Sequence, residues 1–135
     1  MDTITSNPKE KLLLGAGLDI LHFESKEWLE SIAFWKDEVR FFEDLLKKRE
    51  SSADSKKDYS KLLKNLDTIH TDFLKDLEND IKEHEKLLSR LEKGESGLSD
   101  YVYRDKHQQL TIRINTFTTN FKTFKKIIFD YANTL

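Results

Sequence analysis

The sequence contains no cysteine, which excludes disulfide bonds, thiolate metal ligands and cysteine nucleophiles. Proline occurs once and glycine four times, so the chain lacks the many turn residues that a fold of short β-strands needs. Charge of one sign is not in excess either, because 23 basic residues stand against 25 acidic ones. Without a strongly basic surface, we expect no nucleic-acid partner.

Long hydrophobic runs are also missing. The apolar stretch at residues 12–18 is far shorter than the ~20 residues that span a bilayer, and it lacks the basic start of a signal peptide. We therefore expect no membrane partner and, by default, a cytoplasmic location. Residues 1–23 are predicted to form an N-terminal arm or short helix, followed by a single helical domain at residues 24–135.

What the chain does contain is apolar residues at helical spacing, four and three positions apart, which share one side of an α-helix and no face of a strand. This spacing predicts helices over residues 25–49, 55–93 and 98–133, and Gly94 suits the position just past a helix end. The apolar positions are Trp28, Ile32, Trp35, Val39, Phe42 and Leu46 in the first helix, Tyr59, Leu62, Leu66, Ile69, Phe73, Leu77, Leu87 and Leu91 in the second, and Tyr103, Leu110, Ile114, Phe117, Phe121, Phe124, Ile128, Tyr131 and Leu135 in the third.

Three long helices joined by two short turns predict an all-α fold, an antiparallel bundle. In the second helix, Leu74 and Leu88 are placed beside the buried face rather than at its centre. One feature competes with the helical prediction. Leu110, Ile112 and Ile114 alternate within a threonine-rich stretch, and such residues favour β-structure. The four-and-three spacing extends over more than four heptads in total, so we predict helix there.

Polar residues on the apolar faces are the candidates for a site. Counting back from the second turn, His84 faces His107, and counting back from the first turn, Asp80 lies level with Glu24. We therefore predict that His84, His107, Asp80 and Glu24 form one cluster near one end of the bundle. Such a cluster is either a metal or ligand site built from facing helices or a hydrogen-bonded polar layer that fixes the register of the helices. We favour the polar layer.

Motif tests do not favour catalysis. Ferritin-like metal centres carry Glu-x-x-His on two helices, whereas this chain has one related element, Asp67-Thr68-Ile69-His70. The sequence has no His-Glu-x-x-His motif, no phosphate-binding loop, no dinucleotide-binding glycine turn and no nucleophile elbow. We expect no enzyme activity and commit to no cofactor and no metal.

A protein partner or a homo-oligomer is the better prediction. Arg113 is the only charge between Lys106 and Lys122, and loss of charge with gain of aromatic residues is typical of protein interfaces. The alternatives are that this face packs against the N-terminal arm or is simply solvated. On the first helix the apolar arc is wider than one core contact needs, which marks a candidate interface of Trp28, Phe34, Trp35 and Phe41.

Residues 28–42 read Trp-Leu-Glu-Ser-Ile-Ala-Phe-Trp-Lys-Asp-Glu-Val-Arg-Phe-Phe. This segment resembles the opening helix of small uncharacterised bacterial helical-bundle proteins, through its tryptophan, the Lys-Asp-Glu step and the phenylalanine that follows. The resemblance implies a bacterial origin and a bundle fold, and it carries no function over to this chain.

Overall fold

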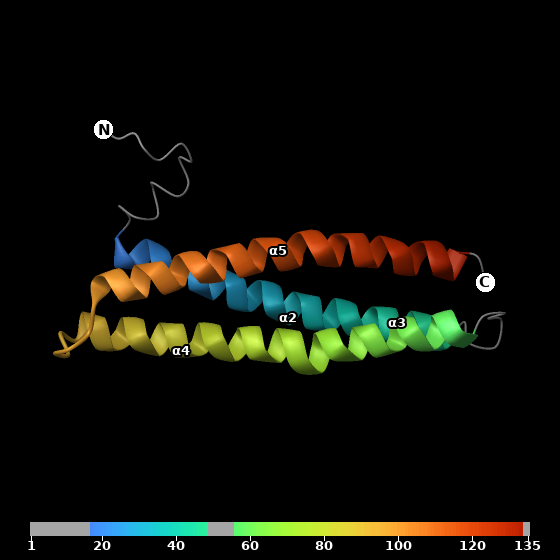
Figure 1. Ribbon diagram of the computed structural model, residues 1–135, viewed down its shortest axis with the longest axis horizontal. Coiled ribbons are helices and arrows are strands. Elements are labelled where there is room, and N and C mark those ends of the chain that lie inside the picture. Colours follow the sequence, from blue (N-terminus) through green and yellow to red (C-terminus); the bar gives the residue numbers. More distant parts are fainter. Residues whose placement is uncertain (1–16, 49–55, 134–135) are drawn as a thin grey trace, which may run out of the picture.

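The computed structural model describes residues 17–48 and 56–133. The elements are α2 (Leu18–Lys48), α3 (Lys56–Thr68), the short π-helix η2 (Ile69–Phe73), α4 (Leu74–Glu92) and α5 (Asp100–Asn133). Because α3, η2 and α4 follow one another without a break, they form the second of three long rods that lie side by side (Figure 1). The predicted all-α bundle is confirmed, and the described part of the chain contains no strand.

Cross-helix contacts give the relative directions of the three rods. His22 pairs with Glu85 and Lys36 with Glu78, so α2 and α4 run antiparallel. His84 contacts His107 and Asp80 contacts Arg113, which makes α4 and α5 antiparallel as well. Consecutive rods are therefore antiparallel, as predicted, and α2 and α5 run in the same direction (Figure 1).

Specific caps set the turn between α4 and α5. Gly94 has φ +73°, a left-handed conformation that glycine adopts without strain. Its N–H donates a hydrogen bond to the carbonyl of Leu91, and the N–H of Glu95 donates to the carbonyl of Arg90. These two hydrogen bonds are the pattern of a Schellman motif at a helix C-terminus. Ser99 then accepts a hydrogen bond from the N–H of Val102 and caps the start of α5. The predicted role of Gly94 is confirmed.

The first helix begins earlier than we predicted. It starts at Leu18 rather than near residue 25, so residues 18–23 belong to the bundle and not to an arm. The reason is that Leu21 and Ser25 continue the helical spacing of Trp28 and are both fully buried. The rest of the predicted arm, residues 1–16, lies outside the described residues.

The threonine-rich part of α5 is helical despite its β propensity. The hydroxyls of Thr111, Thr118 and Thr123 donate to the carbonyls of the residues four positions earlier. This side-chain bond to the preceding turn lets threonine fit inside a helix. The apolar spacing of Leu110, Ile114 and Phe117, all buried, then decides the structure.

A π-turn changes the phase of the second rod. The N–H of Leu74 bonds the carbonyl of Ile69, five residues earlier, so η2 contains one more residue than an α-helical turn. Leu74 is completely buried and Phe73 is 38% exposed, so our placement of Phe73 in the core and of Leu74 beside it was wrong. Downstream, Leu88 is buried, whereas Leu87 and Leu91, which we placed at the centre, are only partly buried. A strict α-helical period cannot reveal such an inserted residue.

Candidate functional site

Three of the four residues predicted to cluster do come together. Nε2 of His84 lies 3.0 Å from Nδ1 of His107, and Nε2 of His107 lies 2.8 Å from a carboxylate oxygen of Glu24. The three side chains come from α4, α5 and α2, so the chain of contacts crosses all three rods of the bundle. It forms a continuous polar layer inside an otherwise apolar core.

The contacts of Glu24 fix the proton positions in this layer. A carboxylate only accepts hydrogen bonds, so Nε2 of His107 carries the proton and donates it to Glu24. In a neutral ring Nδ1 of His107 is then an acceptor, and Nε2 of His84 must be the donor to it. The donors point from His84 to His107 to Glu24, whose side chain is 27% exposed. The layer is therefore an ordered path from a buried ring to the surface.

Burial favours the neutral form of both histidines. His84 is 3% exposed and His107 1% exposed, and aromatic rings cover them: Tyr103 stacks on His84 with ring centres 4.2 Å apart, and Trp28 on His107 at 4.5 Å. Desolvation, followed by the charge of His107 and of Lys106, lowers the pKa of His84 to about 4. Desolvation also lowers the pKa of His107, against the opposing effect of its bond to Glu24.

Asp80 does not belong to the layer, so this part of the prediction was wrong. Its carboxylate bonds Arg113 at 2.8 Å on an exposed part of the surface. In α4 the residues Leu74, Leu77, Ile81, His84 and Leu88 face the core. Position 80 lies one turn before His84 but falls outside that face, on the side toward α5. His22, which the same register count places near this level, pairs with Glu85 of α4. Glu85 itself was not predicted, because no sequence pattern distinguishes it from the other charged residues of α4.

Several polar atoms in the same region are buried and lack a hydrogen-bond partner among the described residues: Nδ1 of His84 and the hydroxyls of Ser25 and Tyr103. Buried polar groups without partners reduce stability relative to apolar side chains of similar shape. The layer is therefore a poor source of stability and a good source of specificity, because only one register of the helices pairs its members.

The same residues do not form a metal centre. Within residues 17–48 and 56–133 no group of three or more histidine, aspartate or glutamate side chains is arranged to hold an ion. The geometry explains this: both nitrogens of His107 are bonded to protein groups, and one nitrogen of His84 is bonded to His107. Ligand atoms have to converge on one point, whereas these atoms are arranged in a line.

The predicted interface of the first helix divides into two halves. Trp35 is buried against Phe117, with ring centres 4.6 Å apart, and Trp28 is partly buried on His107. Phe34 and Phe41 are 62% and 56% exposed. The wide apolar arc thus serves two purposes: the tryptophans fill the core, and the two phenylalanines remain on the surface. Glu38, between them in sequence, pairs with Lys125 at 2.9 Å.

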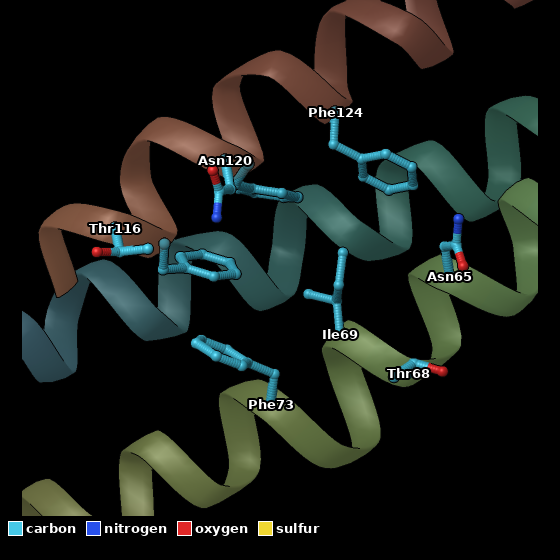
Figure 2. Close-up of a pocket in the computed structure, with 9 residues that line it drawn as sticks. Asn65, Thr68, Ile69, Phe73, Thr116, Asn120 and Phe124 are labelled. Atoms are coloured by element: carbon cyan, nitrogen blue, oxygen red, sulfur yellow. The ribbon is translucent and has the colours of Figure 1, made fainter. Parts of the chain in front are cut away.

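A hollow with an apolar lining lies elsewhere, between the second rod and α5. An open pocket of about 420 Å³ begins at the π-turn and follows α5. Figure 2 shows Ile69 and Phe73 projecting from the second rod and Phe124 from α5 into the space between them, with α2 running behind. Its lining residues are Asn65, Thr68, Ile69, Phe73, Thr116, Phe117, Asn120, Phe121 and Phe124.

The π-turn shapes one end of this pocket. It turns Phe73 away from the core and against α5. There its ring stacks on Phe117, with ring centres 4.9 Å apart and an angle of 15° between the ring planes. Phe117 in turn stacks on Phe121 at 5.1 Å. A second hollow of about 400 Å³ shares Asn65 and Phe124 with the pocket and continues past Ile127 to Tyr131. We call the two together the α3/α5 groove.

Charge is absent from the pocket that the π-turn opens. All nine of its lining residues are aromatic, aliphatic, hydroxyl or amide side chains, in a chain of which 36% is charged. Asp58 and Lys61 line only the far end of the groove. An apolar hollow with a neutral polar rim is typical of the centre of a protein interface.

Comparison with known proteins gives no further guide. No protein-family model, no curated protein and no solved structure matches the chain. No helix within the described ranges is long and apolar enough to cross a membrane.

Proposed function

We propose that this protein is a non-enzymatic binding module that receives an amphipathic helix of another polypeptide in the α3/α5 groove. The observation that carries the proposal is the charge-free lining of the pocket between Phe73 and Phe124. Thr116 and Tyr131, at the two ends of the groove on α5, are about 22 Å apart along the helix at ~1.5 Å per residue. That length matches about four turns of a docked helix.

The shape of the groove favours a helix over other occupants. It lies between two helices, α3 and α5, and α2 runs behind both (Figure 2), so a helix placed there completes a four-helix arrangement. Asn65, Thr68, Thr116 and Asn120 lie along the pocket and offer hydrogen bonds without requiring a charged ligand. Helix-in-groove recognition uses this combination of an apolar floor and polar edges.

The exposed phenylalanines form a second, weaker candidate surface. Phe41 and Phe129 line a hollow between α2 and α5 and are 56% and 45% exposed, and Phe34 of α2 is 62% exposed. The hollow is also lined by Lys122, Lys125 and Lys126. Charge is depleted at the centre of interfaces, so this surface fits that role less well than the groove does.

Site-specific photo-crosslinking in the producing cells tests the proposal. A benzophenone amino acid replaces Phe124 in the groove or, as a matched control, Phe23, which is 61% exposed on α2. The expected result is a discrete adduct from position 124, attached to a segment with apolar residues three and four apart, and no such adduct from position 23. Adducts of the same pattern from both positions, or none from position 124, would overturn the proposal.

A further inference from the structure

The α3/α5 groove sets a clear requirement for its occupant. The occupant has to present about four helical turns without a charge facing Phe117, Phe121 and Phe124, because the pocket offers no charged partner. An unpaired charge placed against such a surface loses its hydration without compensation. The occupant therefore needs both the length of the groove and an uncharged face.

The apolar residues of the N-terminal segment are too close in sequence to Gly17 to reach the groove. Gly17 and Leu21 lie at the level of Leu88 and Tyr103. The groove begins at Thr116, about 20 Å further along α5, and continues for about as far again. Residues 12–14 are the apolar part of the segment, and an extended chain of five residues reaches only about 17 Å. This reach is shorter than the distance along the bundle from Gly17 to Thr116.

Helix α5 does meet the requirement. Between Lys106 and Lys122 its only charge is Arg113, and that guanidinium is already bonded to Asp80 of α4 at 2.8 Å. The exposed positions of this stretch are neutral: Ile112 is 60% exposed, and Asn115, Thr116, Thr119 and Asn120 are exposed as well. The pocket end of the groove, which Phe73 and Phe117 line, has no charged lining residue, and neither do these exposed positions of α5.

We propose, on the basis of the function proposed above, that the occupant is a second copy of this chain, which inserts its α5 antiparallel into the α3/α5 groove. The groove wall and the neutral face are adjacent parts of the same helix, because Thr116, Phe117, Asn120 and Phe121 line the pocket. A two-fold symmetric dimer needs one self-complementary patch of this kind. Each copy then supplies the fourth helix that the other lacks.

The symmetry places Asn120 close to the two-fold axis. Antiparallel packing about a point near this residue brings the neutral stretch of one α5 against the groove of the other, and the reverse contact follows from the same operation. Ile112 and Ile127, 60% and 50% exposed on the single chain, flank this point. The dimer covers both side chains.

Sedimentation velocity of the purified chain tests the dimer. The wild type is expected to sediment as a dimer at tens of micromolar, and Asn120→Lys is expected to raise the dimer dissociation constant at least about 100-fold, because two lysines then meet at the axis. The matched control is Asn79→Lys on the exposed side of α4, which should leave the dimer intact. Circular dichroism has to show the same helix content for all three proteins.

A disulfide test uses the absence of native cysteine. Oxidised Asn120→Cys should form a covalent dimer in high yield, and Asn79→Cys should not. A monomer at high concentration, or a dimer that Asn120→Lys leaves unchanged, overturns the inference. If the chain is monomeric and position 124 still crosslinks to a helix of another protein, the inference fails and the proposed function stands; if neither a dimer nor an adduct is found, both fail.

Discussion

Nε2 of His84 donates a hydrogen bond to Nδ1 of His107 over 3.0 Å, and this bond joins α4 to α5 inside the core. The direction of the bond follows from Glu24, which accepts the other proton of the His107 ring at 2.8 Å. Protonation of His107 breaks this bond, since its Nδ1 can no longer accept, and protonation of His84 places a buried charge on its Nδ1, which has no hydrogen-bond partner among the described residues. The layer therefore ties the register of three helices to the protonation of two buried rings.

Acid sensitivity is the first expected consequence. The pKa of His84 is lowered from 6.5 to about 4 by burial. Between these two pH values the unfolded chain therefore binds a proton at His84 and the folded chain does not. Stability is then complete above pH 6.5 and is lost as the pH falls from 6.5 toward 4. For His84 alone the loss between pH 7.5 and pH 5.0 amounts to about 2 kcal/mol. Urea unfolding at pH 7.5, 6.5, 5.5 and 5.0 measures it.

The matched variants for this measurement are His84→Gln and His70→Gln. Glutamine at position 84 keeps a donor for His107 but does not titrate, so the loss of stability between pH 6.5 and 5.0 should shrink. His70 lies in η2, outside the polar layer, and its replacement should leave the loss as it is in the wild type. An equal pH dependence in all three proteins would mean that the layer does not control acid stability.

Removal of the charge of Glu24 should make the acid response stronger. The bond and charge of Glu24 raise the pKa of His107 against the effect of burial, so Glu24→Gln lowers that pKa further. The difference in proton binding between unfolded and folded chains then grows, and the variant loses more stability at pH 5.5 than at pH 8. At pH 8 only a charge-assisted hydrogen bond is weakened, at a cost of about 1 kcal/mol.

Glu27→Gln is the control for this variant, because Glu27 is exposed on the same helix. Chemical denaturation of both variants at pH 8 and pH 5.5 measures the loss in free energy of unfolding at each pH. If Glu24→Gln loses no more at pH 5.5 than Glu27→Gln does, the carboxylate has no influence on the buried rings.

The sequence predicted the parts of this structure that depend on periodicity. Leu110, Ile114 and Phe117 share the helical spacing that continues through α5, and this spacing outweighed the local β propensity of the threonines between them. His84 and His107 were paired correctly because the turn at Gly94 is short and close to both. Periodicity with a nearby turn is a strong constraint on which residues face each other.

The π-turn and the groove could not be predicted from the spacing of apolar residues. The extra residue in η2 turns Leu74 rather than Phe73 into the core. Leu77 and His84 belong to both the predicted and the observed core face of α4, and the prediction took positions 80 and 87 instead of Ile81 and Leu88 as their neighbours on it. The α3/α5 groove is likewise invisible in the sequence, because a groove is a space between helices rather than a pattern within one. The neutral stretch of α5 was its only signal, and it indicated an interface without showing where the hollow lies.

The phase shift can be tested with two neighbouring residues. Leu74 is completely buried, so Leu74→Ala should lower the free energy of unfolding by about 2–5 kcal/mol. Phe73 is 38% exposed and contacts Phe117, so Phe73→Ala should lower it by about 1 kcal/mol, the range of an aromatic pair. Urea denaturation compares the two. The reverse order would return Phe73 to the core and remove the basis for the pocket.

Deletion of a single residue gives a sharper test of the same turn. Without Thr71, Ile69 and Leu74 are four residues apart, so an ordinary α-helix places both on the core side and every downstream residue keeps its phase. Deletion of Asn79 from the regular part of α4 instead rotates all that follows by about 100°, which moves His84 and Leu88 out of the core. We expect the Thr71 deletion to change the free energy of unfolding by less than about 1 kcal/mol and the Asn79 deletion to prevent cooperative folding. If both deletions are equally damaging, residues 69–73 are a necessary part of the helix rather than an inserted residue that the bundle accommodates.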